Sequence, residues 1–301
     1  IWVSSFLKRE EAEDIRGMLH DNALPFTTGS QIVSALMLGL QEAFDREKIL
    51  LLFDAASHPN EEVKVRALIS ILITLYTYRK RTQLYPQIAD RLAALAETPG
   101  FIKTIRTIIL RFILARETEK ITRKLQDEII PEMLKLSPKL SKKINLNELT
   151  PEDLTGNEMN PEWESFFSDS TLGKKMVEFG ELQQEGADVM HSTFVHLKNF
   201  PFFHELSNWL LPFTIEHSYF DDQFTPDNEA EKQMLDSMTF AAFMCNSDKY
   251  SLYFSMMQLP KEARKMMMNQ FDSQATEMIQ QNKEELINKR GKQDTIIGQY
   301  I

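Results

Sequence analysis

Hydrophobic positions recur every three or four residues along the first half of the chain, and prolines separate the segments that show this period. Such spacing is typical of amphipathic helices. Proline is tolerated in a first helical turn but breaks a helix interior, so Pro25, Pro59 and Pro86 mark helix starts. The predicted helices span 30–44, 60–79, 84–97 and 101 onward. The connections are short, and we therefore expect successive helices to be antiparallel neighbours.

Each predicted helix has one apolar stripe that is expected to face a core. In the helix that begins at Phe101, the stripe consists of Ile102, Ile105, Ile109, Phe112 and Ile113. The apolar residues of the first helix also recur in the second. Val33, Ala35 and Leu36 return 32 positions later as Val65, Ala67 and Leu68, a period in the range of helical-hairpin repeats.

The stretch from Leu50 to Leu75 contains the clearest helical hairpin. An apolar helix ends at an aspartate, a turn with proline follows, and the second helix opens with a valine, a basic residue and an alanine. These residues are Asp54, Pro59, Val63, Lys64 and Ala67. The pattern resembles a HEAT repeat, although Lys64 stands where the family usually has Arg. The resemblance implies an α-α superhelix of stacked antiparallel hairpins, since one hairpin cannot cover its own apolar faces.

The character of the chain changes after Met133. Pro138, Pro151, Gly156 and a polar run interrupt the helical period there. With little glycine and no hairpin turn signals, the whole chain is predicted to be all-α. We predict a HEAT-like helical-hairpin array over 1–131, an irregular boundary over 132–160 and a C-terminal helical lobe over 161–301.

Three later segments of the sequence carry a second resemblance to known proteins: Gly186–Asp188, Phe200–Phe213 and Cys245–Tyr250. They are similar to a group of Bacteroidetes helical proteins that carry tetratricopeptide repeats near the C-terminus. This resemblance implies no known activity. The tetratricopeptide signature itself is not found before Ile301.

Cysteine usage and the apolar tracts bear on location. Cys245 is the only cysteine, so it excludes an internal disulfide and fits a reducing compartment. No apolar tract reaches the roughly 18 residues that a membrane span needs. The chain opens on Ile1 rather than Met. We interpret it as a piece of a longer protein and expect a cytoplasmic location without membrane partners.

The charge is unevenly distributed. Residues 60–143 hold 17 Lys and Arg against 9 Asp and Glu, a balance of +8, so the remainder of the −10 chain has −18. HEAT-like folds with basic faces can hold a duplex through phosphate contacts, so one alternative is a nucleic-acid-binding module. Its candidate residues are Lys103, Arg106, Arg111, Lys120, Arg123 and Lys124. A solvated or internally paired basic face is the preferred interpretation.

The densest aromatic run lies between Phe200 and Phe213, where Pro201 can open a short helix and Pro212 can end it. Large aromatics anchor many protein interfaces, but most of them are core residues. Packing between lobes is therefore preferred, with partner binding as the alternative. The candidate partner-binding residues are Phe202, Phe203, Trp209 and Phe213.

Signatures of catalysis are sparse. Asp188 and His191, with Glu185 one turn earlier, share a helix face and can ligate a metal, but a matching pair from another helix is missing. Cys245 lies on an apolar stripe and is interpreted as a buried structural thiol. We expect no cofactor and no small-molecule substrate. The leading hypothesis is a non-enzymatic scaffold for a protein partner; the alternatives are the nucleic-acid module and a metal-dependent helical enzyme around Asp188 and His191.

Overall fold

The computed structural model describes residues 1–4, 6–124, 198–220, 244–259 and 291–301, together with 232, 235, 238, 239 and 264. Every regular element in these ranges is a helix, which confirms the all-α prediction. The helices of the first half are α1 (Arg9–His20), α2 (Phe26–Glu42), α3 (Arg46–Ala55), α4 (Glu61–Thr77), α5 (Arg79–Thr82), α6 (Pro86–Ala96) and α7 (Phe101–Lys124). After them come η3 (Pro201–His204), η4 (Leu206–Leu210), η5 (Ser218–Phe220), α14 (Asn246–Met257) and α17 (Gly291–Tyr300).

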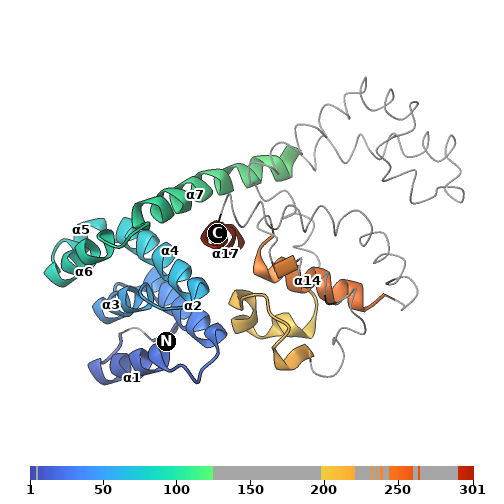
Figure 1. Ribbon diagram of the computed structural model, residues 1–301, viewed down its shortest axis with the longest axis horizontal. Helices are drawn as coiled ribbons and strands as arrows, with labels where there is room; N and C mark the ends of the chain where they lie inside the picture. The colour runs from blue at the N-terminus through green and yellow to red at the C-terminus, as the bar shows by residue number, and fades with distance from the viewer. Residues whose placement is uncertain are drawn as a thin grey trace, which may run out of the picture.

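The first half forms three consecutive helical pairs, α1 with α2, α3 with α4 and α6 with α7 (Figure 1). The predicted hairpin at Leu50–Leu75 is the second of them. Its helices begin at N-caps that the sequence supplies. The Asp45 side chain accepts from the backbone N–H of Glu47 and Lys48, and the Asn60 side chain accepts from that of Glu62. These caps satisfy backbone donors that a helix start leaves unpaired.

Asp54 links the three pairs. One of its carboxylate oxygens lies 2.7 Å from Arg16 Nε on α1, and the other lies 3.0 Å from Arg91 on α6. The carboxylate therefore bridges a helix from the pair before it and a helix from the pair after it. Lys64, at the position where the resembling family has Arg, pairs instead with Glu61 of its own helix at 3.4 Å.

The first core is aliphatic and lies between α2 and α4. Val33, Leu36, Val65 and Ala67, members of the 32-residue echo, are all fully buried in it. The echo thus corresponds to neighbouring positions on two packed helices. α17, near the end of the chain, joins the same core through Ile296 and Ile297. The sequence analysis gave no separate helix at these positions, Gly291–Tyr300.

The second core is aromatic and lies beside the first half (Figure 1). Pro201 opens η3 as predicted, but the run to Phe213 forms two short 3-10 helices rather than one helix. Side chains fold the run back on itself, because Asn208 Nδ2 donates to Phe202 O and Trp209 Nε1 donates to Phe203 O. The rings of Phe202 and Phe203 then pack against those of α14.

The predicted domain limits can be compared with the positions of the described helices. Helices α1 to α7 lie within the predicted array, 1–131. The predicted boundary, 132–160, lies outside the described residues. Of the predicted lobe, 161–301, the aromatic core is one described part, and α17 is another that packs on α4 and α7 of the array.

Candidate functional site

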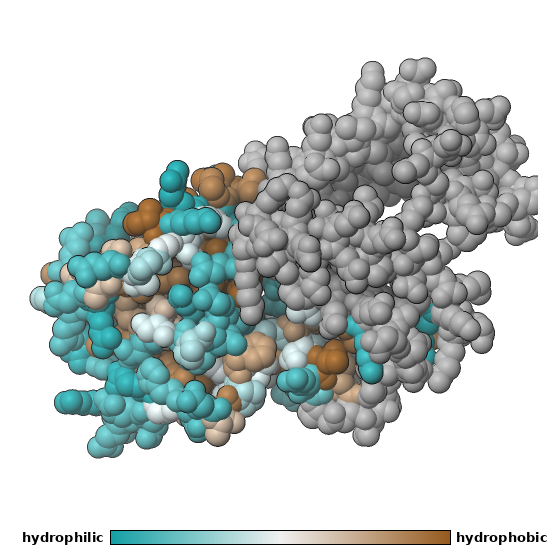
Figure 2. All heavy atoms as spheres, in the orientation of Figure 1, coloured by the Kyte–Doolittle hydropathy of each residue, from teal (hydrophilic) through white to brown (hydrophobic). Residues whose placement is uncertain are grey.

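One side of α7 exposes large apolar side chains. The exposed fractions are 62% for Ile102, 43% for Ile109, 59% for Leu110 and 56% for Ile113. We call these four residues the α7 face. Figure 2 shows apolar side chains interleaved with polar ones along this helix. Contiguous exposed apolar side chains of this size are typical of interaction surfaces.

This exposure corrects the predicted stripe of α7. Ile105 and Phe112 of that stripe are partly buried against the core, but the fully buried residues of the helix are Thr104, Ile108 and Arg111. α17 determines this choice, because Gln293 accepts from Thr104 Oγ1 at 2.8 Å and Asp294 pairs with Arg111 at 3.5 Å. The apolar arc of α7 is too wide for α6 and α17 to cover, and Ile102, Ile109 and Ile113 are left in solvent.

Basic side chains surround the α7 face. Lys103, Arg106 and Arg116 are exposed. No Asp or Glu occurs between Phe101 and Arg116, so nothing on this length of helix balances them. The surface is apolar with a positive rim.

The six residues of the nucleic-acid hypothesis have different surroundings. Lys103, Arg106 and Arg123 are exposed, whereas Arg111 is 9% exposed and paired with Asp294. Lys120 and Lys124 belong to α7, but their side chains are outside the described set. Arg111 therefore holds α17 in place rather than meeting a phosphate.

The four aromatic candidates for partner binding are mostly core residues. Phe202, Phe203 and Phe213 are 1%, 5% and 8% exposed and belong to the aromatic core, whose described members all come from residues 200–257 and not from both predicted lobes. Trp209 is 41% exposed, yet its indole N–H is used within the fold. Lys198 Nζ lies 5.3 Å from the centre of that ring and 2.6 Å from Asp248.

Glu185, Asp188 and His191, the weak metal alternative, lie outside the described residues. Within the described ranges, no group of three or more His, Cys, Asp or Glu side chains is placed to hold a metal ion. Cys245 is half-buried just before α14 and lies 3.3 Å from Ser247 Oγ. Burial raises the pKa of its thiol, which disfavours the reactive thiolate.

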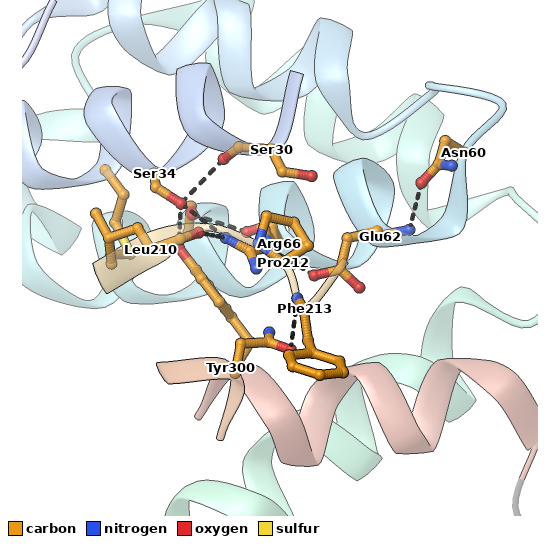
Figure 3. A network of polar contacts seen from close by, with 12 residues as sticks. Ser30, Ser34, Asn60, Glu62, Arg66, Leu210, Pro212, Phe213 and Tyr300 are labelled. Carbon is orange, nitrogen blue, oxygen red and sulfur yellow. Dashed lines mark hydrogen bonds and ion pairs between the residues drawn. The ribbon is translucent and has the colours of Figure 1, made fainter. Parts of the chain in front are cut away.

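The junction between the two cores is organised by Arg66, on α4 (Figure 3). This side chain is 1% exposed. Its Nε donates to Glu62 at 2.8 Å, and a terminal nitrogen donates to Ser34 Oγ at 3.2 Å and to Leu210 O at 2.5 Å. The guanidinium also lies 4.4 Å from the ring centre of Tyr300 on α17. One buried cation thus joins α2, α4, η4 and α17.

A cavity of about 290 Å³ lies beside this cation, and we call it the junction cavity. Its wall is mainly apolar with a few polar groups, as small-molecule sites usually are. The apolar side comes from Phe26, Pro212, Phe213 and Ile296. The polar side comes from Asn60, Glu62, Thr239, Asn246, Thr295 and Gln299.

Lys249 lies behind this wall and is fully buried. Its Nζ donates to the backbone oxygen of Thr239 at 3.2 Å, and Gln299 donates to the same oxygen at 2.8 Å. Burial lowers the pKa of Lys249 from 10.5 to about 7, and the negative charge of Glu62 opposes that change. Strongly shifted pKa values beside a cavity are typical of functional sites.

The sequence reasoning missed Arg66, Asn246, Lys249 and Tyr300. A signal existed for three of them. Asn246 and Lys249 fall within the Cys245–Tyr250 segment, whose polar residues now prove buried at the start of α14. Arg66 stands between Val65 and Ala67, so a charge inside an apolar helix was visible. Its distant partners, Leu210 O and the Tyr300 ring, lie 144 and 234 positions away and had no local signature.

Comparison with known protein families, with curated proteins and with solved structures finds no match for this chain. Among the described helices, none is both long enough and apolar enough to cross a membrane.

Proposed function

We propose that the protein is a non-enzymatic scaffold that binds a protein partner through the α7 face. The exposure of Ile102, Ile109, Leu110 and Ile113 is the observation that carries the proposal, because four exposed apolar side chains on one helix lose favourable burial unless something covers them. The three exposed cations beside them favour a partner of complementary charge. The partner is an amphipathic helix with an acidic rim, which packs its apolar stripe against the α7 face.

The proposed architecture that presents this face is a HEAT-like α-α superhelix. Three consecutive helical pairs, the Asp54 bridge across them and the buried 32-residue echo support it. In such an array each pair covers its neighbour, so the outer face of the last pair stays open until another element docks on it. The α7 face occupies this position in the described part of the array.

A displayed library of helical peptides tests both the surface and the partner chemistry. The wild-type chain should enrich amphipathic helices with acidic residues beside the apolar stripe. The double variant I109S/I113S should lose at least tenfold in affinity for them. The matched control is Leu84→Ser, since Leu84 is 75% exposed and lies outside the α7 face.

Two outcomes overturn the scaffold proposal. In the first, the folded wild-type chain enriches no helical peptide from the library. In the second, wild type and I109S/I113S bind the enriched peptides equally well. Recovery of a partner protein by pull-down from cells must also require Ile109 and Ile113. Turnover of a small molecule by the chain, with no such partner recovered, would contradict the proposal.

The nucleic-acid module remains the second candidate because Lys103, Arg106 and Arg123 are exposed. A labelled duplex titrated at low salt tests it, since phosphate contacts are strongest there. Binding that falls steeply with salt, and falls further in K103E/R106E, would favour nucleic acid over protein. The metal-dependent enzyme around Asp188 and His191 is tested by elemental analysis of protein purified without an affinity tag.

A further inference from the structure

The junction cavity is built where two helices begin. Asn60 is the N-cap of α4, and Asn246 is the first residue of α14. Both side chains line the cavity. Helix starts carry partial positive charge and favour anionic groups. The cavity therefore receives the positive ends of a helix from each of the two cores.

The two asparagines present amide N–H groups to this space. The Asn60 side-chain oxygen accepts from Glu62 N at 2.9 Å, and that of Asn246 accepts from Phe213 N at 3.1 Å. A backbone N–H can only donate, so these contacts assign the oxygens and leave both NH₂ groups on the other branch. Asn246 is 6% exposed, and no described residue accepts from its Nδ2. The Nδ2 atom itself is not fully buried, so it is accessible from the cavity, where a ligand or water can accept from it.

Glu62 provides the opposite charge in the same wall. One carboxylate oxygen is held by Arg66 Nε at 2.8 Å, and among the described residues none donates to the second. Glu62 is two residues from Asn60, so an acceptor of cationic groups lies close to the donors just described. The Thr295 hydroxyl can serve either role. Phe26, Phe213 and Ile296 also line the cavity and offer an apolar surface.

We propose that the junction cavity binds a free α-amino acid with an apolar side chain. Its carboxylate accepts from the Asn60 and Asn246 amides at the helix starts, and its ammonium donates to Glu62. Its side chain packs against Phe26, Phe213 and Ile296. A zwitterion matches this wall better than an anion or a cation alone, because donors and a carboxylate stand side by side. The volume, about 290 Å³, is near the lower end for ligand sites and suits a molecule of this size.

Isothermal titration calorimetry and thermal unfolding with L-leucine, L-methionine and L-phenylalanine test the assignment. At least one should bind and raise the unfolding temperature, since a ligand that binds only the folded state stabilises it. N-acetyl-L-leucine lacks the ammonium and L-leucinamide lacks the carboxylate. Each should bind at least tenfold more weakly than L-leucine if the cavity recognises both the ammonium and the carboxylate of the amino acid.

Three variants locate the binding. Thr295→Phe fills the cavity from α17 and should abolish binding. Glu62→Gln keeps an oxygen for Arg66 but removes the charge, and it should weaken binding at least tenfold. Thr77→Phe is the matched control, because Thr77 is exposed at the far end of α4, about 20 Å from the cavity by helix rise. It should bind like wild type.

Absence of binding by all three amino acids to the folded chain overturns the proposal. Binding that survives Thr295→Phe, or that is equal for L-leucine and its two blocked analogues, also overturns it. Circular dichroism of each variant establishes that the fold persists. The result is independent of the scaffold proposal, since none of these variants touches the α7 face.

Discussion

Among the described residues, the first core has 24 buried hydrophobic side chains, of which only Phe44 and Phe53 are aromatic, whereas eight of the 11 in the second core are Phe or Tyr. The aliphatic core is supplied by long helices whose apolar positions repeat. The aromatic core is supplied by α14 and by short 3-10 turns, whose backbone is held by side-chain hydrogen bonds from Asn208 and Trp209. The first is organised by periodicity and the second by specific contacts, so the two should respond differently to substitution.

Phe202→Ala should have the largest effect. The Phe202 ring packs against those of Tyr219, Tyr250 and Phe254 at centroid distances of 5.2, 4.7 and 5.1 Å. Removing a buried phenylalanine costs about 3–5 kcal/mol of unfolding free energy. Urea unfolding followed by tryptophan fluorescence and by far-ultraviolet circular dichroism measures the loss. We expect the two transitions to separate, because the aromatic core fails first.

The control for this variant is Leu206→Ala, since Leu206 is 54% exposed. It should cost well under 1 kcal/mol, as surface substitutions usually do. Coincident transitions in Phe202→Ala would show that the two cores unfold as one unit and would remove the distinction drawn above.

Arg66→Met tests the link between the cores. Removing one partner of a buried ion pair leaves an uncompensated charge and costs about 3 kcal/mol. Leu210 O and Ser34 also lose a donor. Adding Glu62→Gln should recover part of the loss. Chemical unfolding measures both, with Arg106→Met as the exposed control; a cost below about 1 kcal/mol for Arg66→Met would mean that the cores do not depend on this cation.

Tyr250→Phe should cost less, about 1–3 kcal/mol, the desolvation cost of buried groups left unpaired. The Tyr250 hydroxyl accepts from Thr214 N at 2.9 Å and lies 2.8 Å from Pro212 O as a donor. The ring itself stays in place, so the effect isolates the hydrogen bonds from aromatic packing. Thermal unfolding provides the measurement. Tyr76→Phe, at a 74% exposed position, should be neutral, and equal behaviour of the two variants would refute a specific role for the hydroxyl.

The smallest effect concerns Lys249 and pH. Because the pKa of Lys249 is about 7 in the folded protein, the folded state loses a proton above pH 7 that the unfolded chain keeps up to about pH 10.4. The unfolded state then binds more protons, so the free energy of unfolding rises with pH, by at most about 1.4 kcal/mol per pH unit for one proton. Burying this ammonium is therefore most costly below pH 7.

Unfolding titrations at several pH values between about 7 and 8.5 reveal this slope. Lys249→Met should flatten it and should stabilise the protein most at the acidic end. Because both chains retain Cys245 and Tyr250, whose pKa values burial raises, the difference between them isolates the lysine. An identical slope in both chains would contradict the lowered pKa.

The helices of the array were predictable because local rules were sufficient. Asp45 and Asn60 cap helices, Pro86 opens one, and the apolar period placed Val33, Val65 and Ala67 in a core. The burial of the aromatic residues was predictable, but the backbone conformation of the segment that carries them was not. Its 3-10 turns depend on bonds such as Asn208 to Phe202 O, which no periodic pattern encodes.

The candidate sites were the least predictable. The stripe of α7 was assigned to the interior because its residues are apolar, yet Ile102, Ile109 and Ile113 lie in solvent. Which part of a wide apolar arc is buried depends on the helix that packs on it, and here that helix is α17, more than 180 residues later. The junction cavity likewise draws its wall from segments between Phe26 and Gln299.

The sequence by itself determined the helical class, the hairpin of α3 and α4 and the polar and apolar sides of α2 and α4, because caps, prolines and the 3.6-residue period act within a few residues. Only the tertiary structure decided which side of α7 stays open, how Arg66 is paired and where the junction cavity forms. Those features depend on contacts between residues far apart in the chain, whose burial and charge are settled only when the two cores meet.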